Sequence, residues 1–432
     1  MPTLSNSVLG AAAPIAGRAA SGPCRGCGGV ALALVVDLGA QPPAERFVAP
    51  EELVSPDALL DLRILVCTTC WLVQLEGEPV PPGDEPGGLA FSVSPTMRAH
   101  VDGLVDDVLE RAGGAPGLSR GTPLRIVEVA SHGNRLAERF HARGTLSTLV
   151  EAVPHFAADA EAAGVATVEA RLTPEVAAAI VADSGPADAF VDAFYLAHDP
   201  RPAEYLAGVT GLLAHDGVAV FEFDHLLPIV LETQYDGFRH GHASYLSLGA
   251  FTRLLDNAGL VLEDAVMTPA YGGSVRAFVR LRGPSGPGHR ARAILSAESR
   301  AGLEGLRAYE AFAERVDSAR ARFRAFLDER RRAGDVVVAY GAPSRGNTLL
   351  NSSAVTPADV PFAVDRSASK HGRYLPGSRI PIIPVEHVAK VRPAYLLILT
   401  WDLRDEVIEQ MAGVRAWGGR FVVPLPELTV VD

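Results

Sequence analysis

The sequence predicts an α/β protein in which a small cysteine-bearing module precedes two α/β domains. Three observations predict this class. Two Cys-x-x-Cys pairs stand near the N-terminus, apolar strand patterns alternate with helical patterns over most of the chain, and the stretches 78–88 and 282–288 are rich in proline and glycine. The expected divisions are a tail at 1–22, a module at 23–88, a middle domain at 89–282 and a C-terminal domain at 289–432.

The cysteine pairs predict a metal site. Cys24 and Cys27 form the first pair and Cys67 and Cys70 the second, and the chain has no other cysteine. Two such knuckles are typical of a tetrahedral four-thiolate zinc site. A disulfide framework and a redox dithiol are the alternatives, but four cysteines do little for 432 residues and no thioredoxin-like pattern follows either pair. Because all four ligand positions are filled, we expect a structural zinc.

Composition excludes several classes of function. A net charge of −12 argues against general nucleic-acid binding, and the basic stretch 315–332 alternates with apolar and acidic residues, as on a solvated helix face. No apolar run approaches the ~20 residues that span a bilayer. Residues 1–22 have no basic start before their apolar part, so they read as a disordered tail and not as a signal peptide. Reduced thiolates favour the cytoplasm.

The alternation of strands and helices predicts parallel sheets covered by helices. Helical patterns begin near Met97, Arg135 and Ala203, and apolar residues at three- and four-residue steps from Leu295 to Leu327 predict one long amphipathic helix. The predicted strands are 125–129, 147–151, 189–193, 218–223 and 275–280 in the middle domain, then 336–340, 362–365 and 395–399 in a smaller C-terminal unit.

The first middle-domain strand leads into a candidate cofactor loop. Glu128 lies in this strand, and Ala130, Ser131 and His132 follow it directly before a helix, where backbone amides meet a ligand. Glu151 ends the next strand, about 20 residues on, where a carboxylate accepts hydrogen bonds from a ribose diol. A bound nucleoside and a plain structural turn both remain open.

A second candidate site follows the strand at 218–223. Arg239, His240 and His242 stand in a segment where sites of α/β proteins usually form, and they offer a general base and an oxyanion stabiliser. Metal binding by His240 and His242 is the rival interpretation. A purely structural role for each histidine is a third.

Longer motifs carry a family resemblance over nearly the whole chain after the tail. They are Cys67-x-x-Cys70 with Leu72–Leu75, Leu196–His198, Ser244–Leu248, Gly272–Arg276, Tyr340–Pro343, Gly346–Asn351 and Trp417–Pro424. With these motifs the chain resembles the three-domain sugar C-methyltransferases of deoxysugar biosynthesis, of the tetronitrose, novobiose and mycarose type. The resemblance implies a central Rossmann-like S-adenosylmethionine-methyltransferase domain and a smaller Rossmann-like C-terminal domain. It also implies that the zinc module lies against the middle domain and helps to wall the sugar site.

The resemblance implies a reaction and its residues. Enzymes of this family transfer a methyl group from S-adenosylmethionine to the carbon next to the ketone of a nucleotide-linked, usually dTDP-linked, 4-keto sugar. The family's base falls on His242 and its second active-site histidine on His198. In the C-terminal domain, Arg345 and Asn347 belong to a strand-to-helix loop that offers donors to a diphosphate, although packing alone is an equal explanation. We add His240 to the expected substrate contacts.

The chain departs from the family pattern at the expected reaction centre. Ala130 and Gly133 stand where the cofactor loop of the family has a glycine and an acid, Arg239 replaces a tyrosine, and Gly241 replaces a glutamate. Arginine stabilises an enolate but does not exchange protons. Two further hypotheses therefore stand beside methyl transfer: ketoreduction or epimerisation in the same sugar-nucleotide pocket, and a non-catalytic paralogue that binds a sugar nucleotide or partners an active enzyme.

Overall fold

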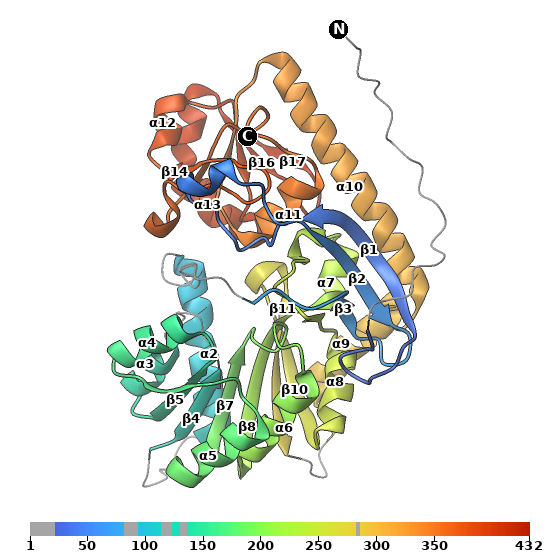
Figure 1. The fold of residues 1–432 in the computed structure, drawn as a ribbon, viewed down its shortest axis with the longest axis vertical. Helices are drawn as coiled ribbons and strands as arrows, with labels where there is room; N and C mark the ends of the chain where they lie inside the picture. Colours follow the sequence, from blue (N-terminus) through green and yellow to red (C-terminus); the bar gives the residue numbers. More distant parts are fainter. Residues whose placement is uncertain (1–21, 82–93, 114–122, 130–135, 282–285) are drawn as a thin grey trace.

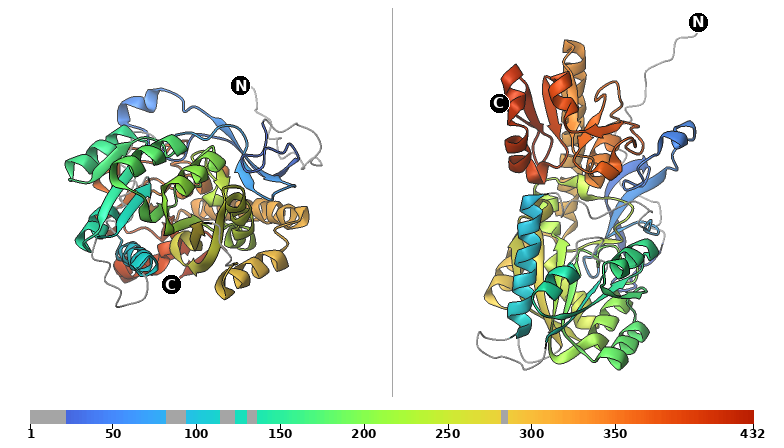
Figure 2. Two further views of the ribbon diagram at one scale, coloured as in Figure 1. Left: turned by 90° about the horizontal axis from the view of Figure 1, so that it is seen from below. Right: turned by 90° about the vertical axis from the view of Figure 1, so that its left-hand side faces the viewer.

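The computed structural model describes residues 22–81, 94–113, 123–129, 136–281 and 286–432. Three sheets build the molecule (Figure 1). The middle domain forms one end, the C-terminal domain forms the other, and the sheet of the zinc module lies along the side and touches both (Figures 1 and 2). The loop residues Ala130, Ser131 and His132 lie outside the described residues, so their expected role stays a prediction.

The N-terminal sheet is antiparallel and is completed by the middle domain. Its first three strands are β1 (Leu32–Gln41), β2 (Leu60–Cys67) and β3 (Val73–Leu75), and η1 (Pro50–Val54) lies between β1 and β2. The fourth strand is β9 (Ser244–Tyr245), which pairs with β3. Because β9 follows the segment that carries Arg239 and His242, this pairing fixes the zinc module beside the second candidate site.

The middle sheet has the strand order β10-β11-β8-β7-β4-β5-β6. Strands β4 to β8 are parallel, and β11 runs antiparallel to both of its neighbours. This sheet confirms the expected Rossmann-like fold of the middle domain. The strands are β4 (Arg125–Val129), β5 (Leu146–Glu151), β6 (Ala166–Glu169), β7 (Ala187–Ala193), β8 (Leu213–Asp224), β10 (Leu260–Thr268) and β11 (Ser274–Leu281).

Helices cover both faces of this sheet, as continuously apolar parallel strands require. Ile126 of β4 points into the core under α2 and α3, whereas Val127 and Val129 point into the opposite core under α5, α6, α8 and α9. Side-chain caps fix two of these helices, since Thr173 accepts from Val176 N and Ser247 from Ala250 N. The helices are α2 (Pro95–Gly113), α3 (Leu136–Ala142), α4 (Pro154–Ala162), α5 (Pro174–Ser184), α6 (Pro202–Leu212), α8 (Leu248–Asn257) and α9 (His289–Ala301).

The C-terminal domain is a smaller α/β unit. Its sheet has the order β14-β13-β12-β15-β16-β17, in which only β17 is antiparallel to its neighbour. Its strands are β12 (Val337–Tyr340), β13 (Ala363–Asp365), β14 (Ile382–Pro384), β15 (Tyr395–Ile398), β16 (Arg420–Val423) and β17 (Thr429–Val431), and its helices are α11 (Ser344–Ser352), α12 (His387–Val391) and α13 (Arg404–Gln410). Short 3-10 segments η4 (Ala368–Lys370), η5 (Trp401–Leu403) and η6 (Ala412–Trp417) complete it.

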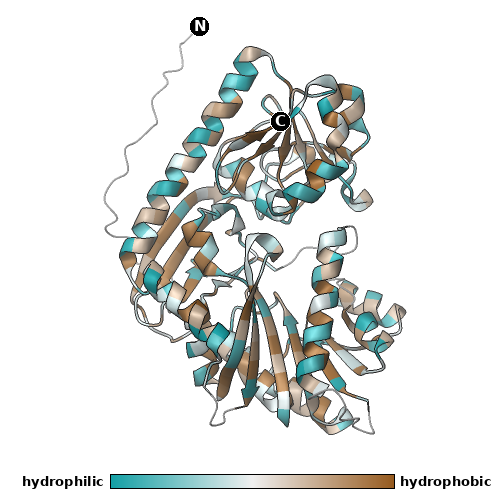
Figure 3. Cartoon of the chain, turned by 180° about the vertical axis from the view of Figure 1, so that it is seen from behind, coloured by the Kyte–Doolittle hydropathy of each residue, from teal (hydrophilic) through white to brown (hydrophobic). Residues whose placement is uncertain are grey.

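The expected long amphipathic helix is confirmed for the apolar residues from Tyr309 to Leu327, whereas Leu295 lies in a separate helix that precedes it. Gly302 ends α9 in a left-handed conformation (φ 75°), and α10 (Leu306–Ala333) starts a new direction. The buried apolar residues of α10 pack into one core with the zinc-module sheet and the C-terminal sheet. Figure 3 shows the hydropathy of this long helix and of the sheets along which it runs. No helix in the described parts of the chain is both long and apolar enough to cross a membrane.

Candidate functional site

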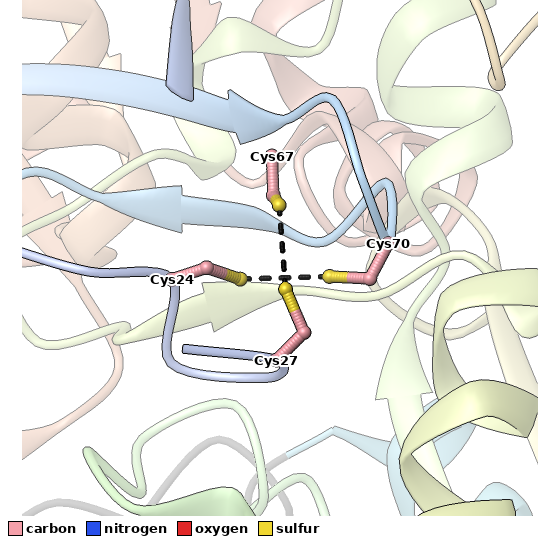
Figure 4. Close-up of side chains that lie close together, drawn as sticks. All are labelled: Cys24, Cys27, Cys67 and Cys70. Atoms are coloured by element: carbon pink, nitrogen blue, oxygen red, sulfur yellow. Dashed lines mark hydrogen bonds between the residues drawn. The ribbon is translucent and has the colours of Figure 1, made fainter. Parts of the chain in front are cut away.

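The four cysteines come together at the end of the N-terminal sheet (Figure 4). Their sulfur atoms all lie within 4.8 Å of one another, with Cys24 and Cys70 Sγ 3.5 Å apart and Cys27 and Cys67 Sγ 3.6 Å apart. Zinc–sulfur bonds of about 2.3 Å place the sulfurs of a tetrahedral site about 3.8 Å apart. Backbone N–H groups of Gly26 and Thr69 point at two of the sulfurs, as they do at thiolates. The cluster fits a structural zinc ion, as the sequence predicts.

Two buried carboxyl groups lie at the carboxyl edge of the middle sheet. Glu128 Oε1 accepts a hydrogen bond from Ala137 N in the first turn of α3, and Glu151 Oε1 accepts one from Val153 N. Burial raises the pKa of Glu128 to about 8 and the pKa of Glu151 to about 7. Both carboxyl groups therefore tend to stay protonated in the ligand-free protein. A ligand with hydroxyl groups could hydrogen-bond to them, and a positive charge on it would favour their ionised form.

Asp192, at the end of β7, is a third buried acid on this edge that the sequence patterns do not single out. It accepts hydrogen bonds from Tyr195 N, Leu196 N and Tyr205 Oη, and burial raises its pKa to about 7. Its bonds hold the turn that leads to His198. Its position at the end of a predicted strand was the only feature of the sequence that could have identified it as a site residue.

His198, Arg239 and His242 meet above the carboxyl ends of β7 and β8. The rings of His198 and His242 pack edge to face with centroids 4.4 Å apart, and Arg239 Nη2 lies 2.5 Å from His242 Nε2. His198 Nδ1 donates to the Gly241 carbonyl oxygen over 2.8 Å. Tyr245 Oη accepts from Arg239 N and donates to Arg239 O, which fixes the backbone of the arginine. The structure therefore brings together all three residues that were predicted to be catalytic.

The surroundings of His242 keep it neutral. Burial lowers its pKa well below the usual value, and the charges of Arg239, His198 and Arg345 lower it further. Because a guanidinium only donates, the Arg239 contact makes Nε2 the acceptor and leaves the proton on Nδ1. His242 therefore carries a lone pair suited to a base, and this lone pair becomes available to another partner when Arg239 turns away.

The residues predicted to bind substrate are all engaged with protein. His240 Nε2 donates to the Leu60 carbonyl of β2 (3.1 Å), and Asn347 Nδ2 donates to the Ala44 carbonyl (2.6 Å). Arg345 pairs with both carboxylate oxygens of Asp236 (3.0 and 3.2 Å) and stacks on the ring of Trp401. All three side chains lie at contacts between domains. Substrate contact by any of them stays a prediction.

His225 belongs to the same stretch of sequence but lies apart from the cluster. It precedes α7 (Leu226–Leu231), and its Nε2 meets Glu298 Oε1 of α9 at 2.6 Å. Glu298 also accepts hydrogen bonds from the backbone N–H groups of Leu248 and Gly249 at the start of α8. His225 thus has a structural role.

Two strained aromatic residues border the site. Phe194, after β7, and Tyr271, in η3 (Ala270–Gly272), have φ values of 73° and 54°, which non-glycine residues rarely adopt. Their rings pack edge to face with centroids 4.9 Å apart. Strain of this kind gathers at functional sites, where the surrounding structure holds it in place. No sequence pattern indicated either residue.

Glu45 is a further charged group of the site that sequence reasoning missed. It follows β1 in the zinc module, and its Oε1 lies 3.0 Å from Arg239 Nε. The segment η2 (Tyr235–Gly237), which precedes Arg239, packs against α11 of the C-terminal domain. Elements of all three parts of the chain therefore surround the cluster.

Comparisons with known proteins agree with this architecture. Residues 269–426 match the family model described as the C-methyltransferase C-terminal domain, and residues 24–84 match a putative zinc binding domain. The chain is 32% identical over 415 residues to the C-methyltransferase NovU of Streptomyces niveus, an alignment that covers 95% of this chain and 96% of that protein.

Solved structures resemble the chain more distantly. A Burkholderia thailandensis 1,6-didemethyltoxoflavin-N1-methyltransferase is 18% identical with a TM-score of 0.30 and covers 49% of this chain and 96% of its own. The N-methyltransferase NodS of Bradyrhizobium japonicum is 15% identical with a TM-score of 0.34 and covers 46% of this chain and 94% of its own. Likenesses at this level do not bear on function. The full-length match to NovU and the two matching family models show that the chain belongs to the zinc-containing C-methyltransferase family.

Proposed function

We propose that this protein transfers a methyl group from S-adenosylmethionine to the carbon next to the ketone of a nucleotide-linked 4-keto-deoxysugar, with dTDP as the nucleotide. The observation that carries the proposal is the cluster of His198, Arg239 and His242 above the middle sheet. Methylation at a carbon acid needs a base for its proton and a donor for the enolate oxygen, and this cluster offers both.

His242 is the proposed base. Its lowered pKa keeps the imidazole unprotonated at neutral pH, so that it accepts a proton without first losing one. Its ring is held on one side by the edge of His198. The proton of the substrate carbon passes to the nitrogen that Arg239 contacts in the ligand-free protein.

Arg239 and His198 are the proposed partners of the ketone oxygen. The guanidinium that donates to His242 Nε2 is a stronger donor to a developing enolate, because charge-assisted hydrogen bonds exceed neutral ones. A substrate oxygen that attracts Arg239 would also uncover the lone pair of His242. One movement of a side chain then prepares both the base and the stabiliser of the enolate.

Glu128 and Glu151 are the proposed protein contacts of the cofactor, together with the loop at Ala130, Ser131 and His132. When bound, S-adenosylmethionine supplies an electrophilic methyl group on a positively charged sulfur. Glu151 ends the second strand of the parallel order, where a carboxylate suits a ribose diol. Glu128 adds negative charge once a cation lies near enough to favour its ionised form.

The sugar nucleotide is proposed to bind between the middle and C-terminal domains, with His240, Arg345 and Asn347 at its border. Arg345 and Asn347 open α11, the helix that follows the first strand of the C-terminal sheet. The contacts that His240, Arg345 and Asn347 make with neighbouring domains would hold the elements around this site in place. We place the enzyme in the cytoplasm, where the zinc thiolates stay reduced.

Product analysis tests the proposal. The protein is incubated with S-adenosylmethionine and dTDP-4-keto-6-deoxyglucose, and the sugar nucleotide is examined by mass spectrometry and NMR in deuterated water. We expect a sugar that has gained one carbon-bound methyl group, formed about 10²–10⁴-fold more slowly with His242→Asn. The matched control His215→Asn changes a histidine in β8 away from the cluster and keeps the reaction.

Other outcomes assign the pocket differently. Exchange of the α-proton with solvent but no methyl transfer would replace the proposal with epimerisation. Calorimetric binding of NADPH, with no heat from S-adenosylmethionine at saturating protein, would replace it with ketoreduction. If neither cofactor binds and no exchange occurs, the catalytic proposal is wrong and the non-catalytic paralogue remains.

A further inference from the structure

The zinc module places a carboxylate in the reaction centre. Glu45 Oε1 lies 3.0 Å from Arg239 Nε in an ion pair, and both atoms are buried although the two side chains are 31% and 21% exposed overall. Neither atom makes a hydrogen bond, so the contact between them is electrostatic. At its other end, Arg239 Nη2 lies 2.5 Å from His242 Nε2. The result is a row of carboxylate, guanidinium and imidazole, drawn from two segments almost 200 positions apart in sequence.

Gly241 leaves the space that this carboxylate occupies. A Cβ atom at position 241 would stand 3.4 Å from Glu45 Oε1 and 3.6 Å from its Cδ, and apart from the two chain neighbours its three nearest atoms all belong to Glu45. Gly241 is also the residue whose carbonyl oxygen holds His198 Nδ1. A side chain at position 241 would therefore point at the present site of the Glu45 carboxylate.

The backbone of Glu45 is fixed from the C-terminal domain. Its neighbour Ala44 accepts a 2.6 Å hydrogen bond from Asn347 Nδ2, and Asn347 is fully buried in α11. Three residues on, Val48 forms a two-stranded bridge with Tyr374. Contacts with the C-terminal domain therefore fix the backbone on both sides of Glu45, at Ala44 and at Val48.

We infer that Glu45 is a positioning residue: its carboxylate holds the Arg239 guanidinium at the Nε end and so sets the other end against His242. The catalytic consequence rests on the proposed function. The charged groups around the pair are Asp224 near Arg239, and His198 and Arg345 near His242. Without Glu45, the nearest ion-pair partner of Arg239 among the described residues is lost, and the guanidinium no longer has a fixed orientation.

The first test reads the histidine directly and needs no substrate. Long-range ¹H–¹⁵N spectra of histidine-labelled protein should show His242, assigned by its loss in His242→Asn, with the proton on Nδ1. In Glu45→Gln we expect the ¹⁵N shifts of His242 to move toward a mixture of tautomers, whereas Glu51→Gln, the same change at an exposed position of the same module, leaves them in place. Identical His242 signals in wild type and Glu45→Gln would overturn the inference.

The second test moves the carboxylate back into the segment of the base. With S-adenosylmethionine and dTDP-4-keto-6-deoxyglucose, Glu45→Gln and Glu45→Ala should lower kcat ~10-fold, below the 10²–10⁴-fold that acid–base catalysis itself contributes, with little change in KM for the cofactor. The double variant Glu45→Ala/Gly241→Glu should recover most of the lost kcat. A double variant no faster than Glu45→Ala overturns the inference, and the spectra show whether each variant is folded. If the wild type transfers no methyl group but the spectra change as expected, the positioning role stands and the proposed function fails.

Discussion

The four-cysteine cluster and the cluster of His198, Arg239 and His242 are assembled in different ways. The cysteines come from two short knuckles within one module, and the ion they suit needs only four sulfurs at the corners of a tetrahedron. The second cluster needs side chains from two separate segments of the middle domain, and its partner Glu45 comes from the zinc module. The difference teaches that a site built from local spacing can be recognised in the sequence, whereas a site built from tertiary contacts has members that only the structure reveals.

The largest expected effect is loss of zinc. Structural zinc in small modules contributes on the order of 10 kcal/mol, so Cys67→Ser or prolonged chelation should unfold the N-terminal sheet and release the Glu45 segment. Elemental analysis should find one zinc per chain, and thermal unfolding should begin at a much lower temperature after its removal. Thr69→Ser, in the same knuckle but without a ligand atom, should keep both zinc and stability.

A disulfide framework predicts the opposite pattern. The protein would then resist chelators, contain no zinc and lose stability on reduction. That result would break the comparison, because the cysteine site would no longer be a closed metal site.

The next largest effect is loss of the proposed base. His242→Asn keeps the size and polarity of the side chain but removes the proton acceptor, so the rate of methyl transfer should fall by about 10²–10⁴-fold. The zinc content and the unfolding temperature should stay close to those of the wild type. Equal rates in the two proteins would show that another group takes the proton.

The sequence predicted most strands of both α/β sheets, because buried parallel strands are continuous apolar runs, but it did not predict β6, β10, β14, β16 or β17. The strand predicted at 125–129 is β4 as observed, and the expected strands near 189–193 and 395–399 match β7 and β15 within a few residues. The split between α9 and α10 was missed, since their apolar residues keep helical spacing across the break at Gly302. The short β9 was also missed, because its pairing with β3 is a tertiary contact with no local pattern.

The candidate site was predictable only in part. The positions of His198 and His242 follow from family motifs, but no spacing rule connects Glu45 with Arg239. In the sequence, Gly241 stands where the family pattern has a glutamate, so the sequence alone indicates that the site has lost a carboxylate. In space, the position that a Cβ atom of residue 241 would take lies in van der Waals contact with the carboxylate of Glu45, which comes from the zinc module. Sequence reasoning reached the members of the cluster but not the contacts that hold them.

A smaller effect separates structural anchoring from catalysis. Asn347→Ala leaves the Ala44 carbonyl without its buried donor and should cost about 1–3 kcal/mol of unfolding free energy. It should also lower kcat, because Ala44 precedes Glu45. Asn351→Ala removes a comparable bond to Pro376 one turn further along α11 and is the matched control. It should lower stability without lowering kcat. Equal kcat values in the two variants would show that the Asn347–Ala44 hydrogen bond does not affect catalysis.

The smallest effect is a pH dependence of cofactor binding. In the ligand-free protein, burial raises the pKa of Glu151 to about 7 and that of Glu128 to about 8, so both bind protons that free glutamates have lost. Their contribution to stability is fully present below about pH 4.5 and is lost as the pH rises through these folded-state values. A cationic cofactor favours the ionised carboxylates and releases these protons.

The affinity for S-adenosylmethionine should therefore increase between about pH 6 and about pH 8, by at most about tenfold per pH unit for each proton released. Calorimetry in buffers of different ionisation enthalpy counts the protons. Glu151→Gln should reduce the count, whereas Glu169→Gln, the same change at the register partner of Glu151 on β6, should not. An affinity independent of pH would mean that neither buried carboxyl ionises when the cofactor binds, and this edge of the sheet would then hold the ligand through neutral hydrogen bonds alone.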